Sequence, residues 1–490
     1  MLSIPGAMIT ESAFSAHRPR DISPATRNHS RPGASPHTRL YTLNNMANRQ
    51  LATRRDFLAK TSLAAAAVKT IRPTVTARSA ARVIGANDRI NVGSIGVGGM
   101  GTVHLRTFVK QSEEQKDLQV VAVSDVYTVR KDAARSIAHL AEKDVHHDYR
   151  DLLTRSDVDA VVIATPEHWH GQMALDALAA GKDVYLQKPM TSTIEEARLV
   201  TEAVKKYNRV LQVGSQGLSS AATHKARELI EQGEIGTVLW GQGSSARNST
   251  LGEWNWKVES EGTPETIDWN RWLGSAPRRP FSAERYFRWR KYWDYSGGIA
   301  TDLYYHILGP LLFGMGAQFP TYVTGSGGIY VQKDREVPDT YATQIEYPNY
   351  FITLAGSMAN SAGDKFHPLV IYGHEGTISF GGSSVTVSKE VMTPDSLQSK
   401  PPAPPPKVYE VNIPPDVHRT HTDNFFSCMR SRKLPNLHAE LGYQMTVAIQ
   451  LGVEAYREGR GKVFDPATQR VVERHPARPA WEGDGKNHDA

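Results

Sequence analysis

The feature that most constrains the fold is a glycine-rich turn directly after a short apolar segment. Residues 89–95 alternate and then become apolar, as in a buried strand, and lead into the turn Gly96-Val97-Gly98-Gly99-Met100-Gly101. A helical pattern follows. In a G-x-G-x-x-G turn the first glycine permits the sharp change of direction, the second brings bare backbone to a pyrophosphate, and the third lets the helix pack on the strand. The sequence therefore predicts dinucleotide binding by Gly96, Gly98, Gly99, Met100 and Gly101.

A carboxylate follows the next predicted strand at the position that such a site requires. Residues 118–124 read as a strand, and Asp125 comes 24 residues after Gly101, close to the spacing of the acid that binds the ribose hydroxyls. A carboxylate there repels a 2′-phosphate, so NAD is predicted as the cofactor. Arg130 and Lys131 leave NADP open. The alternative for Asp125 is a helix cap or turn residue.

Strand and helix patterns alternate through residue 215. Strands are predicted over 159–164, 183–187 and 210–214, and helices over 128–142, 168–180 and 193–207. This alternation is typical of a parallel, doubly wound Rossmann sheet, on which ligands bind at the carboxyl ends of the strands. Ligand contacts are therefore expected from residues 165–170 and 187–189, besides the glycine turn and Asp125.

The second half of the chain is rich in strands without intervening helices. Strands are predicted over 237–245, 322–331, 340–347, 350–357, 369–372, 377–380 and 384–388, and amphipathic helices over 418–430 and 441–456. The predicted fold class is α/β: an N-terminal Rossmann sheet plus a C-terminal α+β domain with a large, mostly antiparallel sheet. The predicted domains are a leader over 1–86, a dinucleotide-binding domain over 87–215, and a substrate-binding and oligomerisation domain over 216–490.

Charge is distributed unevenly along the chain. Residues 1–86 hold 13 Lys or Arg and 3 Asp or Glu, a net charge of +10, so the remaining chain carries −4 of the total +6. A slightly acidic body is a poor binder of phosphate backbones, which argues against nucleic acid as a partner. No apolar run of about 18 residues exists, so no membrane span is predicted. The single cysteine, Cys428, excludes an intrachain disulfide and a Cys-rich metal site.

The leader resembles a bacterial twin-arginine export signal. Arg54-Arg55 precedes Phe57-Leu58 and a stretch of small residues over 61–68. The resemblance implies recognition by an export machinery for folded proteins and a periplasmic or extracytoplasmic location. The alternative is a basic tail on a cytoplasmic protein. Met46 is a second candidate for the start of the chain.

Four motifs in order resemble the Gfo/Idh/MocA family of oxidoreductases. They are the glycine turn at 96–101, Ala-Thr-Pro-Glu-His-Trp-His at 164–170, Ala-Gly-Lys-Asp-Val-Tyr-Leu-Gln-Lys-Pro at 180–189, and Asp-Leu-Tyr-Tyr-His at 302–306. The resemblance implies an NAD(P)-dependent enzyme that forms a homodimer or homotetramer through the open face of its second sheet. It implies cofactor contacts from Thr165, Pro166, His170 and Gln187, and a cis peptide between Lys188 and Pro189. The family usually has glutamate where this chain has Gln187.

The catalytic candidates are Lys188, Asp302 and His306. Hydride transfer from an alcohol requires an acceptor for the hydroxyl proton and a donor to the developing carbonyl oxygen. Lys188 follows a parallel strand, where the nicotinamide is expected. Asp302 and His306 are four residues apart, so on a helix they share one face, and imidazole exchanges protons near neutral pH. The alternatives without a catalytic role are a surface lysine for Lys188, a helix-capping aspartate for Asp302 and a buried structural histidine for His306.

No metal site is predicted, because His168 and His170 are two residues apart and do not share a helix face. The aromatic and basic residues over 254–295 fit a sugar-binding wall, with a packed insert or an oligomer contact as the alternative. The predicted function is an exported NAD(P)-dependent oxidoreductase acting on a sugar, polyol or glycoside. The alternatives are an NAD-dependent glycoside hydrolase or lyase and a non-catalytic sugar-binding protein.

Overall fold

The structure is a computed structural model that describes residues 89–392, 400–414 and 416–473. The predicted leader, with its Arg54-Arg55 pair, lies outside the described residues. Within those ranges, no helix is both long enough and apolar enough to cross a membrane.

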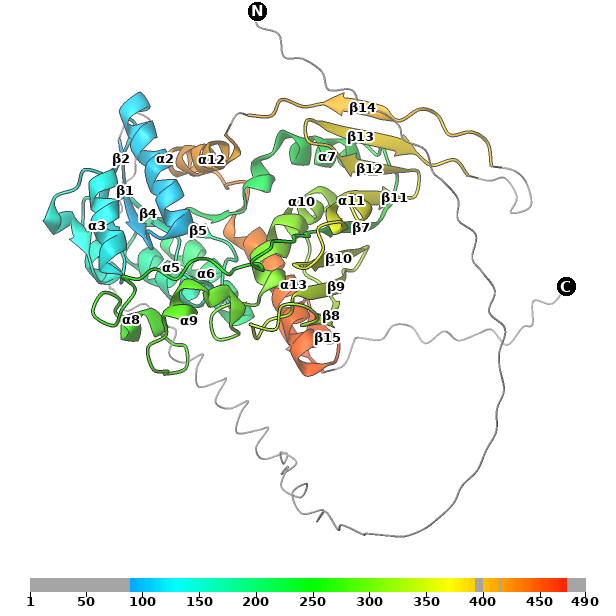
Figure 1. The fold of residues 1–490 in the computed structure, drawn as a ribbon. Coiled ribbons are helices and arrows are strands. Elements are labelled where there is room, and N and C mark those ends of the chain that lie inside the picture. Colours follow the sequence, from blue (N-terminus) through cyan, green and yellow to red (C-terminus); the bar gives the residue numbers. More distant parts are fainter. Residues whose placement is uncertain (1–88, 393–399, 415, 474–490) are drawn as a thin grey trace, which may run out of the picture. The chain divides into compact units, whose positions relative to one another are not determined.

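The first sheet is parallel, with six strands in the order β3-β2-β1-β4-β5-β6 (Figure 1). Its strands are β1 (Ile90–Ile95), β2 (Leu118–Ser124), β3 (Val145–His146), β4 (Ala160–Ile163), β5 (Asp183–Gln187) and β6 (Leu211–Gly214). The helices between them are α2 (Gly99–Gln115), α3 (Thr128–Ile137), α4 (Tyr149–Leu153), α5 (His170–Ala179) and α6 (Ile194–Tyr207). Because β1 pairs with both β2 and β4, the chain winds outward in two directions, which confirms the predicted doubly wound sheet.

The second sheet has ten strands in the order β14-β13-β12-β11-β7-β10-β9-β8-β15-β16. They are β7 (Val238–Ser244), β8 (Tyr322–Gly328), β9 (Thr340–Glu346), β10 (Phe351–Ser357), β11 (Val370–Gly373), β12 (Gly376–Phe380), β13 (Ser384–Lys389), β14 (Lys407–Glu410), β15 (Lys462–Asp465) and β16 (Arg470–Val472). All pairs are antiparallel except β7 with β10, so the predicted sheet type is confirmed.

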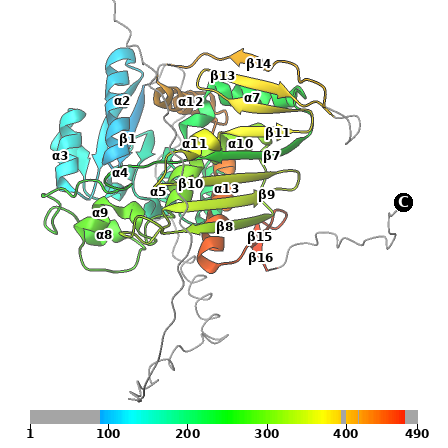
Figure 2. The same cartoon turned by 45° about the vertical axis from the view of Figure 1, so that its right-hand side comes forward.

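The helices of the second half are α7 (Ala221–Glu231), α8 (Trp269–Leu273), α9 (Ala283–Phe287), α10 (Tyr305–Met315), α11 (Gly363–Phe366), α12 (Val417–Ser431) and α13 (Ala439–Glu458). Of these, α7, α10 and α13 pack on one face of the second sheet (Figure 2). In β7, Gly241 and Gly243 face α10, since side chains there would meet Met315 and Ile307. Helix α12 instead packs on the first sheet, where Phe425 and Met429 join the buried cluster that holds Ile90 and Val120.

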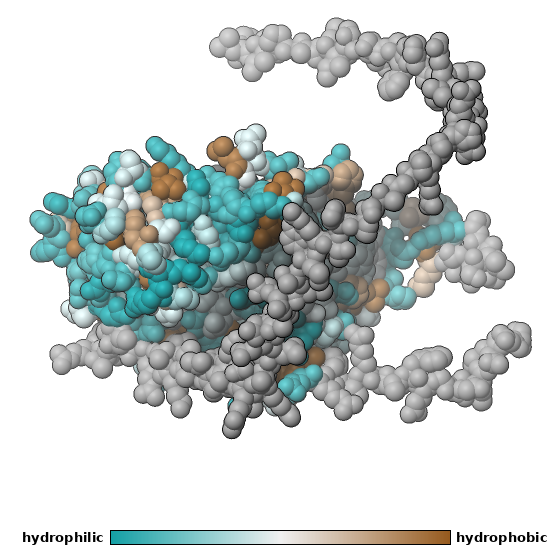
Figure 3. Space-filling model, turned by 60° about the horizontal axis from the view of Figure 1, so that its bottom comes forward, coloured by the Kyte–Doolittle hydropathy of each residue, from teal (hydrophilic) through white to brown (hydrophobic). Residues whose placement is uncertain are grey.

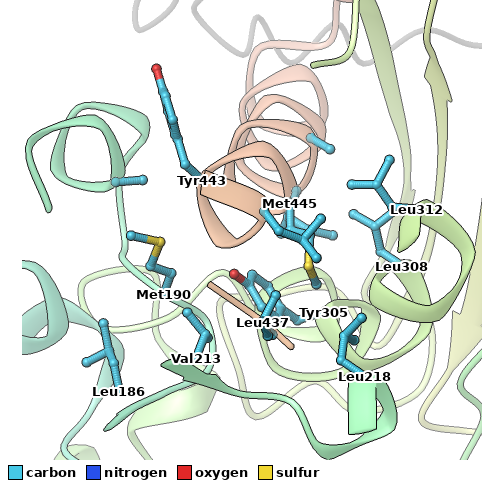
Figure 4. Packing of buried hydrophobic residues seen from close by; sticks show 14 of the residues in the cluster. Leu186, Met190, Val213, Leu218, Tyr305, Leu308, Leu312, Leu437, Tyr443 and Met445 are labelled. Atoms are coloured by element: carbon cyan, nitrogen blue, oxygen red, sulfur yellow. The ribbon is translucent and has the colours of Figure 1, made fainter. Parts of the chain in front are cut away.

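One hydrophobic core joins the two halves near the site. It includes Leu186 and Met190 on either side of Lys188, and Tyr305 and Leu308 on either side of His306 (Figure 4). Met445 of α13 belongs to the same cluster. A shared, close-packed core of this kind fixes the end of β5 against the start of α10.

The surface seen in Figure 3 is mostly hydrophilic where described atoms are visible, and its apolar patches are small and separate. Scattered apolar residues of this kind are normal on a protein surface.

Candidate active site

A cavity of about 1230 Å³ lies where the carboxyl ends of the first sheet meet the second half of the chain. Most of the predicted site residues line it: Gly96, Gly98, Gly99, Met100, Asp125, Thr165, Pro166, Gln187, Lys188, Asp302 and His306. Gly101 and His170 are not in its wall. The cavity is roomy enough for a dinucleotide with a small substrate beside it.

The glycine turn has the geometry of a phosphate cradle. Gly96 has a φ of +79°, and a Cβ there would lie 2.7 Å from Cγ2 of Thr165. At Gly101 a Cβ would lie 1.9 Å from the carbonyl oxygen of Gly96, so the helix approaches the turn as closely as glycine allows. No side chain caps the N-terminus of α2. Bare backbone at a helix N-terminus suits a pyrophosphate, so these residues fit a dinucleotide.

Asp125 holds the glycine turn from the end of β2. One carboxylate oxygen accepts a hydrogen bond from the Val97 N–H at 2.9 Å, and the other accepts from the Tyr127 N–H at 2.9 Å. Each oxygen keeps a lone pair for a ribose hydroxyl. Beside it, the Arg130 guanidinium packs on the rings of Tyr286 and Tyr127, 5.3 and 5.5 Å from their centres.

Lys188 is held by Asp302. The peptide between Lys188 and Pro189 is cis, as the resemblance implied. Lys188 Nζ donates to the backbone carbonyl of Asp302 at 2.7 Å and to its Oδ1 at 2.6 Å. The same Oδ1 accepts from Nε of Arg290 at 2.8 Å, and Oδ2 accepts from the Trp254 indole at 3.2 Å. Burial would raise the pKa of Asp302, but Arg290 and Lys188 overcome it and hold that pKa well below its usual range.

His306 has one ring nitrogen engaged and one available. Nδ1 lies 3.1 Å from Oγ of Ser215, and Nε2 has no hydrogen-bond partner among the described residues. Burial and the charge of Lys188 lower the pKa of His306 to about 3. The imidazole is therefore neutral at physiological pH in this state, which differs from the near-neutral proton exchange expected from sequence, because burial disfavours the charged ring.

The sequence predicts that Asp302 and His306 lie on one regular α-helix, but the structure places them in two different elements. Asp302 belongs to a π-helical turn, η5 (Ala300–Tyr304), and His306 lies in the first turn of α10. Both side chains still line the cavity, yet Asp302 bonds Lys188 and His306 bonds Ser215. Such π-turns occur often at functional sites, where they re-aim a side chain.

Two predicted cofactor residues have hydrogen-bond partners within the protein. His170 is buried behind the cavity wall, with its ring nitrogens 2.6 Å from the carbonyl oxygen of Pro189 and 2.9 Å from that of Thr165. His170 thus links the segment after β4 to the segment after β5, and it does not line the cavity, where the sequence analysis expected it. Gln187 does line the cavity, and its amide nitrogen lies 2.6 Å from Nε2 of His104. Burial lowers the pKa of His104 to about 3, so a neutral amide faces a neutral ring.

Sequence reasoning did not identify Glu167 as a site residue. Its Oε1 accepts from the hydroxyls of Ser296, at 2.7 Å, and Thr301, at 3.0 Å, directly before Asp302. Burial raises the pKa of Glu167 to about 7. Glu167 thus anchors the π-helical turn to the segment after β4. The sequence feature that could have pointed to Glu167 is its position inside the 164–170 motif.

Each half of the chain matches a model of the same protein family. Residues 90–215 match the model of the Gfo/Idh/MocA oxidoreductase family for its NAD-binding Rossmann fold, and residues 274–464 match the model for its C-terminal alpha/beta domain. The levoglucosan dehydrogenase structure with NADH and L-sorbose has a TM-score of 0.58 at 19% identity and covers 76% of this chain and 98% of its own. That likeness shows the shared fold.

Curated relatives match over about a third of this chain. The inositol 2-dehydrogenase of Salmonella typhimurium is 31% identical over 179 residues, which is 36% of this chain and 50% of the relative. A glycosyl hydrolase family 109 protein of Shewanella sp. is 27% identical over 164 residues, or 32% of this chain and 34% of the relative. The chain thus matches about half the length of the inositol dehydrogenases, while the two family models together cover the first sheet and most of the second. With its glycine cradle, its strand-end lysine and both domains matched, the chain belongs to the Gfo/Idh/MocA family of NAD-binding oxidoreductases.

Proposed function

We propose that the protein is an NAD-dependent dehydrogenase that acts on a hydroxyl group of a sugar, polyol or glycoside. The observation that carries this proposal is the shared cavity of three groups: the glycine turn, the Lys188 amine fixed by Asp302, and the unpartnered Nε2 of His306. A proton acceptor and a cationic donor beside one cofactor cradle are what alcohol oxidation needs.

In the proposed reaction, each residue has a separate task. Lys188 uses two of its N–H groups on Asp302, which leaves the third for the substrate oxygen. Nε2 of His306 accepts the hydroxyl proton, and Ser215 holds the ring through Nδ1. Asp302 holds the amine in place. NAD, when bound, supplies the acceptor for the hydride.

Substitution of the two proposed catalytic residues tests this function. Lys188→Ala and His306→Ala should each lower turnover by about a hundredfold or more, because each removes a group that acts in proton transfer or on the developing carbonyl oxygen. The measurement is net NADH formation by the purified full chain with a panel of polyols and sugars. Lys143→Ala and His374→Ala, at exposed positions, are the matched controls. Unchanged turnover in both site variants would remove the assignment.

A redox-neutral glycoside-cleaving activity is the second candidate. The similarity to a glycosyl hydrolase family 109 protein favours it. Release of free sugar from a glycoside without net NADH would support this candidate over the dehydrogenase. Sugar binding without either activity would support a non-catalytic relative, which the neutral Gln187 leaves open.

We also propose that the chain is exported in folded form and assembles as a homodimer or homotetramer. The support for export is the Arg54-Arg55 pair with the small-residue stretch that follows it. Fractionation of cells that express the full chain tests it, and an Arg54→Lys, Arg55→Lys double variant retained in the cytoplasm would bear it out. The support for assembly is the aromatic group of Trp240, Tyr372 and Phe351 on the second sheet.

A further inference from the structure

Arg290 presents two unused nitrogens to the cavity. Its Nε donates to Asp302, and Cζ lies 4.1 Å from the ring centre of Trp289 and 5.0 Å from that of Trp256. Within the described part of the chain, Nη1 and Nη2 have no hydrogen-bond partner, although the side chain is only 21% exposed and lines the cavity. A flat guanidinium held by one edge and against two rings presents a rigid pair of donors.

Positive charge exceeds negative charge at this end of the cavity. Lys188 and Arg290 share the single carboxylate of Asp302. Arg247 also lines the cavity and acts electrostatically on His306, and its nearest carboxylate, Glu253, is 3.6 Å away. An excess of cationic groups in a partly buried site favours an anionic occupant.

The other carboxylates that line the cavity have partners of their own. Asp125 binds the glycine turn, Asp148 caps α4, and Glu196 closes the capping box of α6. Glu259 acts on Tyr127 and Arg130, at the Asp125 end. None of these four is hydrogen-bonded or ion-paired to Arg290 in the described structure, so Lys188 and Arg290 have one carboxylate, Asp302, between them.

We propose that the substrate is a polyhydroxy acid, whose carboxylate is bound end-on by Nη1 and Nη2 of Arg290. This inference rests on the proposed dehydrogenase function and narrows its substrate class. Arg290 and Lys188 both lie within hydrogen-bond distance of one oxygen of Asp302, so the carboxylate and the hydroxyl that reacts are a few bonds apart. Two parallel N–H···O bonds match carboxylate geometry. Trp256, half exposed at the cavity, offers a ring face to the sugar carbons.

Matched pairs of substrates test the proposal. Gluconate with glucitol, and glucuronate and galacturonate with their parent sugars, are assayed for net NADH formation by the full chain. The acid should be preferred in at least one pair, and Arg290→Gln should lower kcat/KM for that acid by about a hundredfold through KM. The neutral partner should change only a few-fold. Arg279→Gln, in the same segment but outside the cavity, is the control and should leave both members unchanged.

A merely structural role for Arg290 predicts a different result. If Arg290 only positions Asp302, Arg290→Gln and Arg290→Lys should lower kcat equally for the acid and the neutral member, and that outcome overturns the proposal. Preference for the neutral member in every pair overturns it as well. Thermal unfolding of both variants shows whether they are folded.

Binding separates this inference from the proposed function. Trp256 and Trp289 flank Arg290, so tryptophan fluorescence reports occupancy without turnover. Saturable quenching by the acids, abolished in Arg290→Gln, supports the inference even when no NADH forms, in which case the dehydrogenase function fails alone. NADH formed from neutral substrates, with no quenching by any acid, overturns the inference while the dehydrogenase function stands.

Discussion

At the scale of single residues, the site depends on carboxyl groups with opposite electrostatic settings. Asp302 is ionised between two cations, whereas Glu167 is buried and accepts hydrogen bonds from the hydroxyls of Ser296 and Thr301. The two carboxyl groups position different parts of the site. Asp302 holds the lysine, and Glu167 holds the turn that carries Asp302.

The raised pKa of Glu167 predicts a pH-dependent stability. Burial moves the pKa from 4.5 to about 7, so between these values the folded state keeps a proton that the unfolded chain loses. The stabilisation from protonated Glu167 is complete below pH 4.5 and is lost as pH rises through 7. Glu167→Gln should remove a decline of roughly 3 kcal/mol over this window. Chemical unfolding of wild type and variant between pH 4.5 and 8 measures this.

Glu142→Gln, at an exposed position, is the control for this prediction and should leave the pH profile as it is in the wild type. An identical pH slope in Glu167→Gln and the wild type would contradict the assignment of a buried, protonated carboxyl.

At the scale of secondary-structure elements, local patterns were enough to predict the sheets. The strands β1, β2, β4, β5 and β6 follow from short apolar runs, and the turn after β1 from its glycines. The four strands β3, β14, β15 and β16 were missed because they are short, and β14 is an exposed edge without an apolar pattern. The π-helical turn was missed because an i, i+4 spacing does not distinguish it from an α-helix.

The contacts between distant segments could not be predicted from sequence. That Arg290 and Trp254 would reach Asp302 depends on how the aromatic segment folds back over the cavity. The place of His170 depends on two backbone carbonyls brought together only in the folded state. Motifs predict Lys188 and His306 as site residues, but the contact between His306 and Ser215 depends on the fold.

The turn between β1 and α2 allows a direct test of close packing. Gly101→Ala would place a methyl group 1.9 Å from a backbone oxygen of Gly96, so the helix must shift. We expect a loss of about 1–3 kcal/mol in unfolding free energy, together with weaker NAD binding. At Gly99 a Cβ meets nothing within 4 Å, so Gly99→Ala should leave the stability unchanged or slightly raised. Thermal unfolding of both variants measures the difference, and equal stability of Gly101→Ala and Gly99→Ala would contradict close packing at Gly101.

At the scale of the whole molecule, the second sheet leaves an aromatic group on the face opposite α10. The Trp240 ring stacks on Tyr372 at 4.1 Å and lies 5.6 Å from Phe351, and all three residues are half-buried. Because Gly241 faces α10, Trp240 points to the other side of the sheet. An aromatic patch on an open sheet face suits a contact with a second copy of the chain.

If two copies associate through this face, a charged side chain placed there should weaken the association. Trp240→Arg should convert a dimer or tetramer into a monomer, since a guanidinium would be buried without a partner at the centre of the contact. Sedimentation velocity of the wild type and variant over a range of concentrations measures the change. Leu434→Arg, at a position that is 75% exposed and outside the sheet, is the control. A wild type that stays monomeric throughout would contradict the expected assembly.

The core shared by the residues around Lys188 and His306 has a consequence for ligand exchange. A hinge motion that separated the two sheets would bring Leu186, Met190, Tyr305 and Leu308 into water, at about 25 cal/mol for each Å² of apolar area. The route for substrate entry and product release therefore has to open elsewhere.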